Sequence, residues 1–306
     1  MNGPTELLPV TVIGGYLGTG KTTLVNHLLR NANGLRLAIL VNEFGELPID
    51  EDLIEAQGDD LIAIAGGCIC CSFGNDLMAA LMNMAAMSPR PDHILIESSG
   101  VAIPGAIIAT ISLLQGFQPD GIVVLVDAET VRNQASDDYI GDTVTRQLAD
   151  ADIVIMNKQD LVTTDQLTTL GTWLSETAQA SVLIPAQHGK VAIEAVIGTN
   201  PSPKKRPPSA HSDALFDSFI LTPNGAVDIE KLAKGLATGP FGVVRSKGYA
   251  TNLDSNLRLL HTVGQRWQIT DAPASSNPGV VCLGLKGQLK REDIVRYCDR
   301  LALVET

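Results

Sequence analysis

A glycine-rich segment near the start of the chain has the composition of a phosphate-binding loop. It reads "GGYLGTGKTT" and fits the pattern G-x-x-x-x-G-K-[ST], with candidate residues at Gly15, Gly18, Thr19, Gly20, Lys21 and Thr22. Glycines let backbone N–H groups close around phosphates, and the helix that begins here adds its partial positive charge. We expect Lys21 to reach the β and γ oxygens, and Thr22 to offer its hydroxyl to Mg²⁺. The segment therefore predicts a nucleotide site in which Lys21 and Thr22 serve catalysis.

A second motif, "IVIMNKQD", predicts which base is bound. It places Asn157, Lys158 and Asp160 at the end of a buried strand. A carboxylate there accepts hydrogen bonds from the N1 and N2 donors of guanine, whereas adenine lacks the second donor and would leave it unpaired. Because this short pattern follows a phosphate-binding loop and ends a strand, it favours GTP and GDP as ligands.

The strand "HILIESSG" ends in polar residues that suit the Mg²⁺ ion and the γ-phosphate. Glu97 is a candidate to hold the ion through water, and Gly100 allows a backbone N–H to approach the γ-phosphate. We count Glu97 with Lys21 and Thr22 as catalytic. A structural role, in which the serines between Glu97 and Gly100 cap the helix that begins near Pro104, is the alternative, and both roles can hold together.

Three of the five cysteines lie within four positions, in the segment "AGGCICCSFGND". On an extended chain Cys68 and Cys70 face the same way, and Cys71 can join them where the strand turns. Three thiolates suit Zn²⁺ or another borderline or soft ion and leave a fourth position open for transfer. Glu43, Glu46, a histidine or a client protein are candidates for that position.

Two other interpretations of the cysteines stay open. A redox role fits a thiol cluster, although a disulfide between Cys70 and Cys71 would be strained and the C-x-x-C spacing is absent. The three cysteines can also pack as small hydrophobic residues.

The elements that must position these motifs are short apolar runs that alternate with helical patterns. The runs are "VTVIGG", "RLAILVNE", "DLIAIAGG", "HILIESSG", "GIVVLVDA", "DIVIMNK" and "SVLIPA". Continuous β-branched runs are typical of strands buried on both faces, and their alternation with helices predicts an α/β fold with a mainly parallel sheet. Since ligands bind at the carboxyl ends of such strands, we expect the motifs to meet at one edge.

Three regions follow from this pattern. Residues 1–198 form the expected P-loop domain, and residues 199–214 include the proline-rich segment "NPSPKKRPPSAH", which we interpret as a linker. Residues 215–306 predict a small α+β domain with a largely antiparallel sheet.

Composition limits the possible partners and location. The 306 residues carry a formal net charge of −12, which opposes binding to nucleic acid. The least charged window, 101–117, is too polar for a membrane span and predicts a buried helix. An odd number of crowded cysteines and a start without a signal-peptide pattern favour the cytoplasm.

The order of these motifs resembles the CobW family of metal-handling GTPases. The resemblance rests on "GGYLGTGKTT", "VNEFGE", "GGCICC", "ESSG", "NKQD" and "VVRSKG", and extends over nearly the whole chain. It implies that GTP hydrolysis controls delivery of a metal, such as Zn²⁺ or Co²⁺, to a client metalloprotein. It also implies roles for residues that bind phosphate (Gly20, Lys21, Thr22, Thr23), guanine (Asn157, Lys158, Asp160) and metal (Cys68, Cys70, Cys71).

The sequence departs from the family pattern in two places. Leu47 and Pro48 stand where members often have a valine and a glycine, in the segment expected to respond to nucleotide. The five histidines are scattered, whereas many members carry a histidine-rich tract, which weakens a role in metal storage.

Other residues carry weaker signals. The methionine-rich helix expected over 76–87 favours apolar packing or a contact in a homodimer over Cu(I) binding. Cys282 and Cys298 are expected in the core of the second domain. Arg245 and Lys247 are candidates for contact with an anionic partner or the GTPase domain, with a solvated strand end as the alternative.

Two hypotheses follow. The first is a Mg²⁺-dependent GTPase, slow without its client, that acts as a metallochaperone or insertase; Glu43, Glu46, Asp50 and Glu97 are its candidates to position the attacking water. The second is a GTP-dependent regulatory or assembly module with structural cysteines and no metal transfer. A third, weaker hypothesis is a P-loop kinase, which "NKQD" disfavours.

Overall fold

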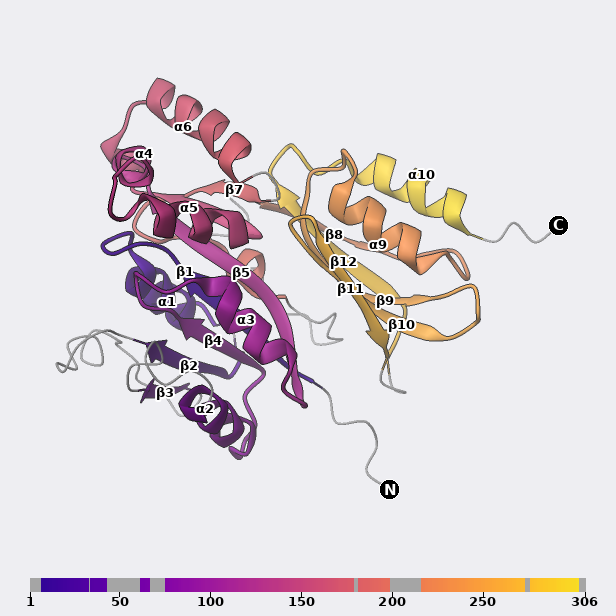
Figure 1. Cartoon of the computed structure of the whole chain (residues 1–306). Helices are drawn as coiled ribbons and strands as arrows, with labels where there is room; N and C mark the ends of the chain where they lie inside the picture. Colours follow the sequence, from indigo (N-terminus) through magenta and orange to yellow (C-terminus); the bar gives the residue numbers. More distant parts are fainter. Residues whose placement is uncertain are drawn as a thin grey trace. The chain divides into compact units, whose positions relative to one another are not determined.

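The computed structural model describes residues 7–32, 34–42, 61–66, 75–178, 181–198, 216–272 and 276–302 (Figure 1). Contacts divide the chain into two compact units, one ending at Val191 and the next beginning at Ala192. Residues 192–198, which we expected in the first domain, group with the second unit and contain the short helix α7 (Ile193–Val196). The expected linker at 199–214 lies outside the described residues.

The described part of the first unit contains a seven-stranded parallel sheet in the order β3-β2-β4-β1-β5-β6-β7. Its strands are β1 (Leu8–Gly14), β2 (Leu37–Asn42), β3 (Leu61–Gly66), β4 (His93–Glu97), β5 (Phe117–Asp127), β6 (Ile153–Asn157) and β7 (Val182–Pro185). All seven apolar runs form strands, and the predicted α/β fold is confirmed. Because β1, β4, β5 and β6 are buried along nearly their whole length, the middle of the sheet is covered on both sides.

Helices connect these strands and cover the sheet. They are α1 (Lys21–Arg30), α2 (Asn75–Ala85), α3 (Pro104–Ser112), α4 (Val131–Ala135), α5 (Gly141–Asp150), α6 (Thr164–Thr177) and the 3-10 turn η2 (Gln159–Leu161). Apolar side chains of α2, α3, α5 and α6 share one core with alternate strand residues such as Val12 and Ile96. The buried leucines of α1 lie outside that core, and α1 lies on the opposite face, behind the sheet in Figure 1.

The strand register aligns the carboxyl ends that carry the motifs. Ile13 is paired with Glu97, and Asp127 is paired with Asn157. At the far side of the sheet, Asn42 of β2 is paired with Gly66 of β3. The last residues of five strands therefore lie along the edge from which the phosphate-binding loop emerges.

The second unit is the expected α+β domain. Its described residues form a five-stranded antiparallel sheet in the order β11-β10-β9-β12-β8. The strands are β8 (Phe216–Leu221), β9 (Val243–Thr251), β10 (Leu257–Val263), β11 (Arg266–Asp271) and β12 (Gly279–Leu285), and the long helices are α9 (Ile229–Thr238) and α10 (Arg291–Leu301). Both helices pack on one face of the sheet around Leu232 and Ile294.

Cys282 and Cys298 lie in that core with 0% and 1% of their surfaces exposed, as we expected. No helix in the described part of the chain is long and apolar enough to cross a membrane.

Candidate nucleotide-binding site

The phosphate-binding loop lies between the end of β1 and the start of α1, and its glycines are required by its backbone. Gly15, Gly18 and Gly20 have φ angles of 132°, 75° and 98°. A Cβ atom at Gly15 would lie 2.3 Å from the carbonyl oxygen of Leu125, and one at Gly20 would lie 2.5 Å from the side-chain nitrogen of Asn157. The positive φ values disfavour other residues at all three positions, and at Gly15 and Gly20 the lack of space also excludes them.

Side chains of the loop hold its backbone in a closed turn. The hydroxyl of Thr19 and the ammonium group of Lys21 both donate hydrogen bonds to the carbonyl oxygen of Tyr16, at 2.9 and 3.3 Å. Lys21 is 9% exposed, so its charge lies within the loop, at the N-terminus of α1. Thr23 lies exposed on the first turn of α1. This concentration of positive potential suits a polyphosphate.

Thr22 and Glu97 come together from α1 and β4. The Thr22 hydroxyl donates a 2.8 Å hydrogen bond to Oε1 of Glu97, which is 4% exposed. A hydroxyl and a buried carboxylate are hard oxygen ligands of the kind that Mg²⁺ prefers. The two residues therefore fit the expected ion: Thr22 would bind it directly and Glu97 through water.

Asn157 connects the phosphate-binding loop to another loop. Its side-chain nitrogen donates to the carbonyl oxygen of Thr19 at 2.9 Å, and its side-chain oxygen accepts from the N–H of Gly189 at 3.0 Å. Both polar atoms of this 2% exposed side chain are engaged within the protein. The side chain thus organises the loops around the site. Because its nitrogen carries two N–H donors and the bond to Thr19 uses one, contact with the base stays a prediction.

Lys158 and Asp160 follow Asn157 and differ in their surroundings. Lys158 has a φ of 59° and forms a 2.7 Å ion pair with Asp127, at the end of β5. Asp160 lies exposed in η2. Its carboxylate is therefore accessible to a ligand at the carboxyl edge.

Sequence reasoning missed the loop after β7, residues 186–190. Asn157 holds this loop through Gly189, and the N–H of Gln159 donates to the carbonyl oxygen of Ala186 at 3.2 Å. A Cβ atom on Gly189, which has a φ of 64°, would lie 2.8 Å from the backbone nitrogen of Leu24 in α1. The glycine in the short loop that follows the strand in "LIPAQHGK" was the available signal.

The segment after β4 forms a tight turn, and its serines do not cap α3. The N-cap of α3 is Ile103, which has no side-chain cap, and Pro104 takes the first helical position. The N–H of Gly105 instead donates to the carboxylate of Asp150 at 2.8 Å. The alternative in which the serines cap the helix is therefore wrong, because a carboxylate from α5 supplies the acceptor.

The candidate metal ligands Cys68, Cys70, Cys71, Glu43 and Glu46 lie outside the described residues, as does Asp50. The glutamates and Asp50 follow β2 in the sequence, and the cysteines follow β3. These two strands end at Asn42 and Gly66, at the carboxyl edge. Within the described ranges, no group of three or more His, Cys, Asp or Glu residues could hold a metal ion.

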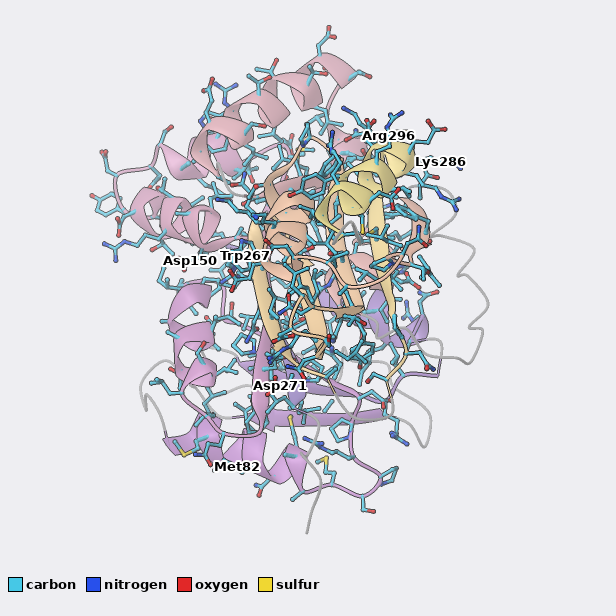
Figure 2. All side chains as sticks on the ribbon, turned by 90° about the vertical axis from the view of Figure 1, so that its right-hand side faces the viewer. Met82, Asp150, Trp267, Asp271, Lys286 and Arg296 are labelled. Carbon is cyan, nitrogen blue, oxygen red and sulfur yellow. The ribbon has the colours of Figure 1, made fainter. Side chains whose placement is uncertain are left out.

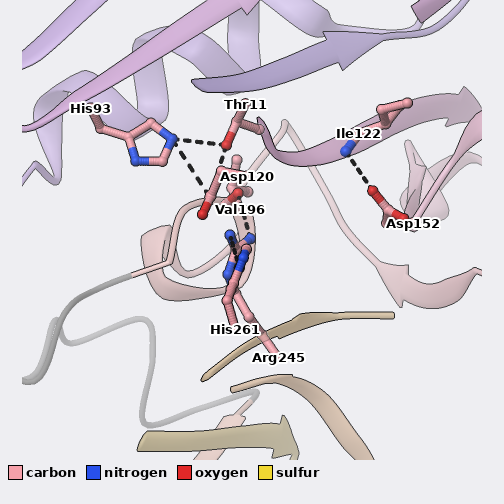
Figure 3. A network of polar contacts seen from close by, with 8 residues as sticks. All are labelled: Thr11, His93, Asp120, Ile122, Asp152, Val196, Arg245 and His261. Carbon is pink, nitrogen blue, oxygen red and sulfur yellow. Dashed lines mark hydrogen bonds and ion pairs between the residues drawn. The ribbon is translucent and has the colours of Figure 1, made fainter. Parts of the chain in front are cut away.

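Buried polar networks also occur away from this edge (Figure 3). In the first unit, Nε2 of His93 lies 2.8 Å from the hydroxyl of Thr11, which donates to Asp120 at 3.1 Å. In the second unit, Arg245 donates to the carbonyl oxygen of Val196 at 3.0 Å.

For Arg245 and Lys247, the alternative of a solvated strand end is wrong, because their side chains are 2% and 5% exposed. In the methionine-rich helix α2, Met84 is buried in the core, as apolar packing predicts, whereas Met78 and Met82 are 40% and 45% exposed (Figure 2 labels Met82).

Comparisons with known proteins agree with this geometry. The model of the CobW/HypB/UreG nucleotide-binding domain matches residues 9–184. A protein named zinc chaperone CobW from a Sinorhizobium species is 30% identical over an alignment of 306 residues, which covers 85% of this chain and 86% of that protein. The zinc chaperone YjiA of Escherichia coli (strain K12) is 32% identical over 201 residues, covering 63% of this chain and 62% of that protein.

Among solved structures, the crystal structure of Zn(II)-bound YjiA GTPase from Escherichia coli aligns with a TM-score of 0.47 at 23% identity, covering 99% of this chain and 100% of that one.

Proposed function

Because this chain belongs to the CobW/HypB/UreG family, we propose that it is a GTP-hydrolysing metallochaperone that acts in the cytoplasm. The observation that carries the proposal is the convergence of Lys21, the Thr22–Glu97 pair and the exposed Asp160 on one edge of the sheet. Sequence relatives named zinc chaperones support zinc as the cargo.

Each part of the site has a task in hydrolysis. Asp160 accepts hydrogen bonds from guanine, and the loop backbone with Lys21 binds the phosphates. Thr22 and Glu97 would hold Mg²⁺, which when bound neutralises charge on the phosphate oxygens. Lys21 and Gly100 stabilise the charge that develops as water attacks the γ-phosphate.

We further propose that Cys68, Cys70 and Cys71 bind the cargo ion and that the nucleotide state controls its release to a client metalloprotein. The described β3 ends at Gly66, two residues before Cys68 in the sequence, at the edge that carries the phosphate-binding loop. A γ-phosphate that reorders this edge would change the surroundings of the thiolates, and hydrolysis would reverse that change.

Two measurements test the proposal. Lys21→Ala should abolish GTP hydrolysis, and normal turnover of this variant would refute a GTPase. Zinc affinity, measured with GDP and with a non-hydrolysable GTP analogue, should differ between the two states; equal affinities would refute the coupling.

A matched pair of variants identifies the zinc ligands. Replacing Cys68, Cys70 and Cys71 together by serine should remove zinc binding, whereas Cys282→Ala, which removes a thiol from the core of the second unit, should retain it. Zinc binding that survives the triple substitution would favour the regulatory module with structural cysteines.

A further inference from the structure

Gln147 of α5 holds the turn that follows β4. Its side-chain nitrogen donates one hydrogen bond to the carbonyl oxygen of Gly100, at 3.1 Å, and a second to that of Ala102, at 2.8 Å. The side chain is 1% exposed, so water does not compete for these bonds. One amide group, with its two N–H donors, thus ties two carbonyl groups of the same turn.

Two further bonds leave the turn little freedom. The N–H of Ala102 donates to the carbonyl oxygen of Ser99 at 3.0 Å, which closes the turn. Asp150, three residues after Gln147 and labelled in Figure 2, accepts from the N–H of Gly105 at 2.8 Å. Helix α5 therefore binds this segment both at the turn and at the start of α3.

The turn also lies directly against the phosphate-binding loop. A Cβ atom at Gly100 would lie 2.5 Å from Cδ2 of Leu17 and 2.8 Å from its backbone nitrogen. Gln147 itself lines a small cavity behind that loop, together with Tyr16 and Thr19. The turn therefore lies next to the expected phosphate site.

We propose that Gln147 is a positioning residue for the γ-phosphate, which acts by fixing the turn that presents the N–H of Gly100. This inference rests on the proposed GTPase function. In this proposal the turn contacts only the γ-phosphate, because the phosphate-binding loop and the guanine motif bind the rest of the nucleotide. Gln147 should thus affect GTP and its hydrolysis, but not GDP.

Glutamate at this position is the sharpest probe, because it keeps the size of the side chain and removes both donors. A carboxylate facing the carbonyl oxygens of Gly100 and Ala102 repels them, whereas its protonated form can donate one hydrogen bond. Gln147→Glu should lower kcat and the affinity for a non-hydrolysable GTP analogue by about 10-fold, the loss expected for two hydrogen bonds. Affinity for GDP should stay within about twofold of wild type.

The pH profile separates positioning from simple packing. Relative to wild type at each pH, kcat of Gln147→Glu should recover as the pH falls from 8 to 6, since burial raises the pKa of a carboxyl group. Gln147→Met, of similar length and without donors, should show the same loss of kcat at all these pH values. It also serves as the probe if the glutamate variant does not fold.

Gln166→Glu is the matched control. Gln166 is exposed in the capping box of α6, where its side-chain oxygen accepts from the N–H of Thr163 at 2.8 Å, a role that glutamate also fulfils. It adds the same charge to the same unit and should leave all these constants unchanged.

Two results for Gln147 overturn the inference. One is unchanged kcat and unchanged preference for the GTP analogue over GDP in both variants. The other is an equal loss of affinity for GDP and the analogue, which would show general damage to the fold. Wild-type protein that neither binds nor hydrolyses GTP would instead refute the proposed function itself.

Discussion

The hydroxyl of Thr22 donates a 2.8 Å hydrogen bond to the carboxylate of Glu97, which joins the first turn of α1 to the end of β4. The two residues are separated by 75 positions, and the parallel register of β1 and β4 brings them together. A hydroxyl beside a buried carboxylate is the arrangement from which we infer a Mg²⁺ site.

Glu97→Gln should weaken the dependence of hydrolysis on Mg²⁺. The amide keeps the shape and can still accept from Thr22, but it lacks the charge that attracts a cation. We expect half-saturation at a 10- to 100-fold higher Mg²⁺ concentration, because removing a residue that holds a metal ion indirectly typically lowers metal affinity by that factor. A titration of hydrolysis with Mg²⁺ measures this, and an unchanged half-saturation would contradict the assignment.

Asp160→Asn should change the preferred base. Asparagine offers one acceptor and one donor, so it can pair with N1–H and the C2 carbonyl of xanthine but not with both donors of guanine. Affinity for GTP should fall and affinity for xanthosine triphosphate should rise, as competition binding would reveal. Since Asp160 is exposed, the stability of the protein should not change; an unaltered preference would place the base elsewhere.

Asn157→Ala should destabilise the protein even without nucleotide. It removes two buried hydrogen bonds, to Thr19 and Gly189, and leaves their partners unsatisfied, which costs about 2–4 kcal/mol. Denaturant unfolding of the nucleotide-free protein measures the loss. Asp160→Ala is the control, and equal stability of the two variants would refute an organising role for Asn157.

The two core cysteines should be unreactive in the native protein. Burial, with a smaller effect of Cys298, raises the pKa of the Cys282 thiol to about 12. Burial, with a smaller effect of the charge of Asp299, raises the pKa of the Cys298 thiol to about 11. Almost no thiolate is present at pH 8, so alkylation should label these cysteines only after unfolding. Peptide mapping after a short alkylation at pH 8 tests this, and native labelling of Cys282 would contradict it.

Asp254, in the turn between β9 and β10, should contribute stability that disappears in acid. Its carboxylate accepts from the N–H of Asn256 at 3.0 Å, and this bond chiefly lowers the pKa of Asp254 to about 2. The lowered value means that the stabilisation is complete above the ordinary pKa near 4 and is lost as the pH falls through 2. The melting temperature of Asp254→Asn should therefore lie below that of wild type at pH 6, and the difference should shrink towards pH 2. A difference independent of pH would exclude the charge as its source.

Local patterns in the sequence determined the strands, the helices and the phosphate-binding loop. Continuous apolar runs rich in β-branched residues are typical of strands buried on two faces, and the glycines of the loop have φ angles that other residues avoid. Parallel strands then require the motifs at their carboxyl ends to share one edge, which the pairing of Asp127 with Asn157 bears out.

Only the tertiary structure decided which polar atoms meet at that edge. The sequence predicts that Asn157 contacts the base, and the structure adds that its side chain joins two loops through Thr19 and Gly189. Nothing in the sequence around Gln147 marks it, because its partners Gly100 and Ala102 lie 47 and 45 positions away. Such contacts depend on the register of the sheet and on how α5 packs against it, and neither is encoded in a short stretch of residues.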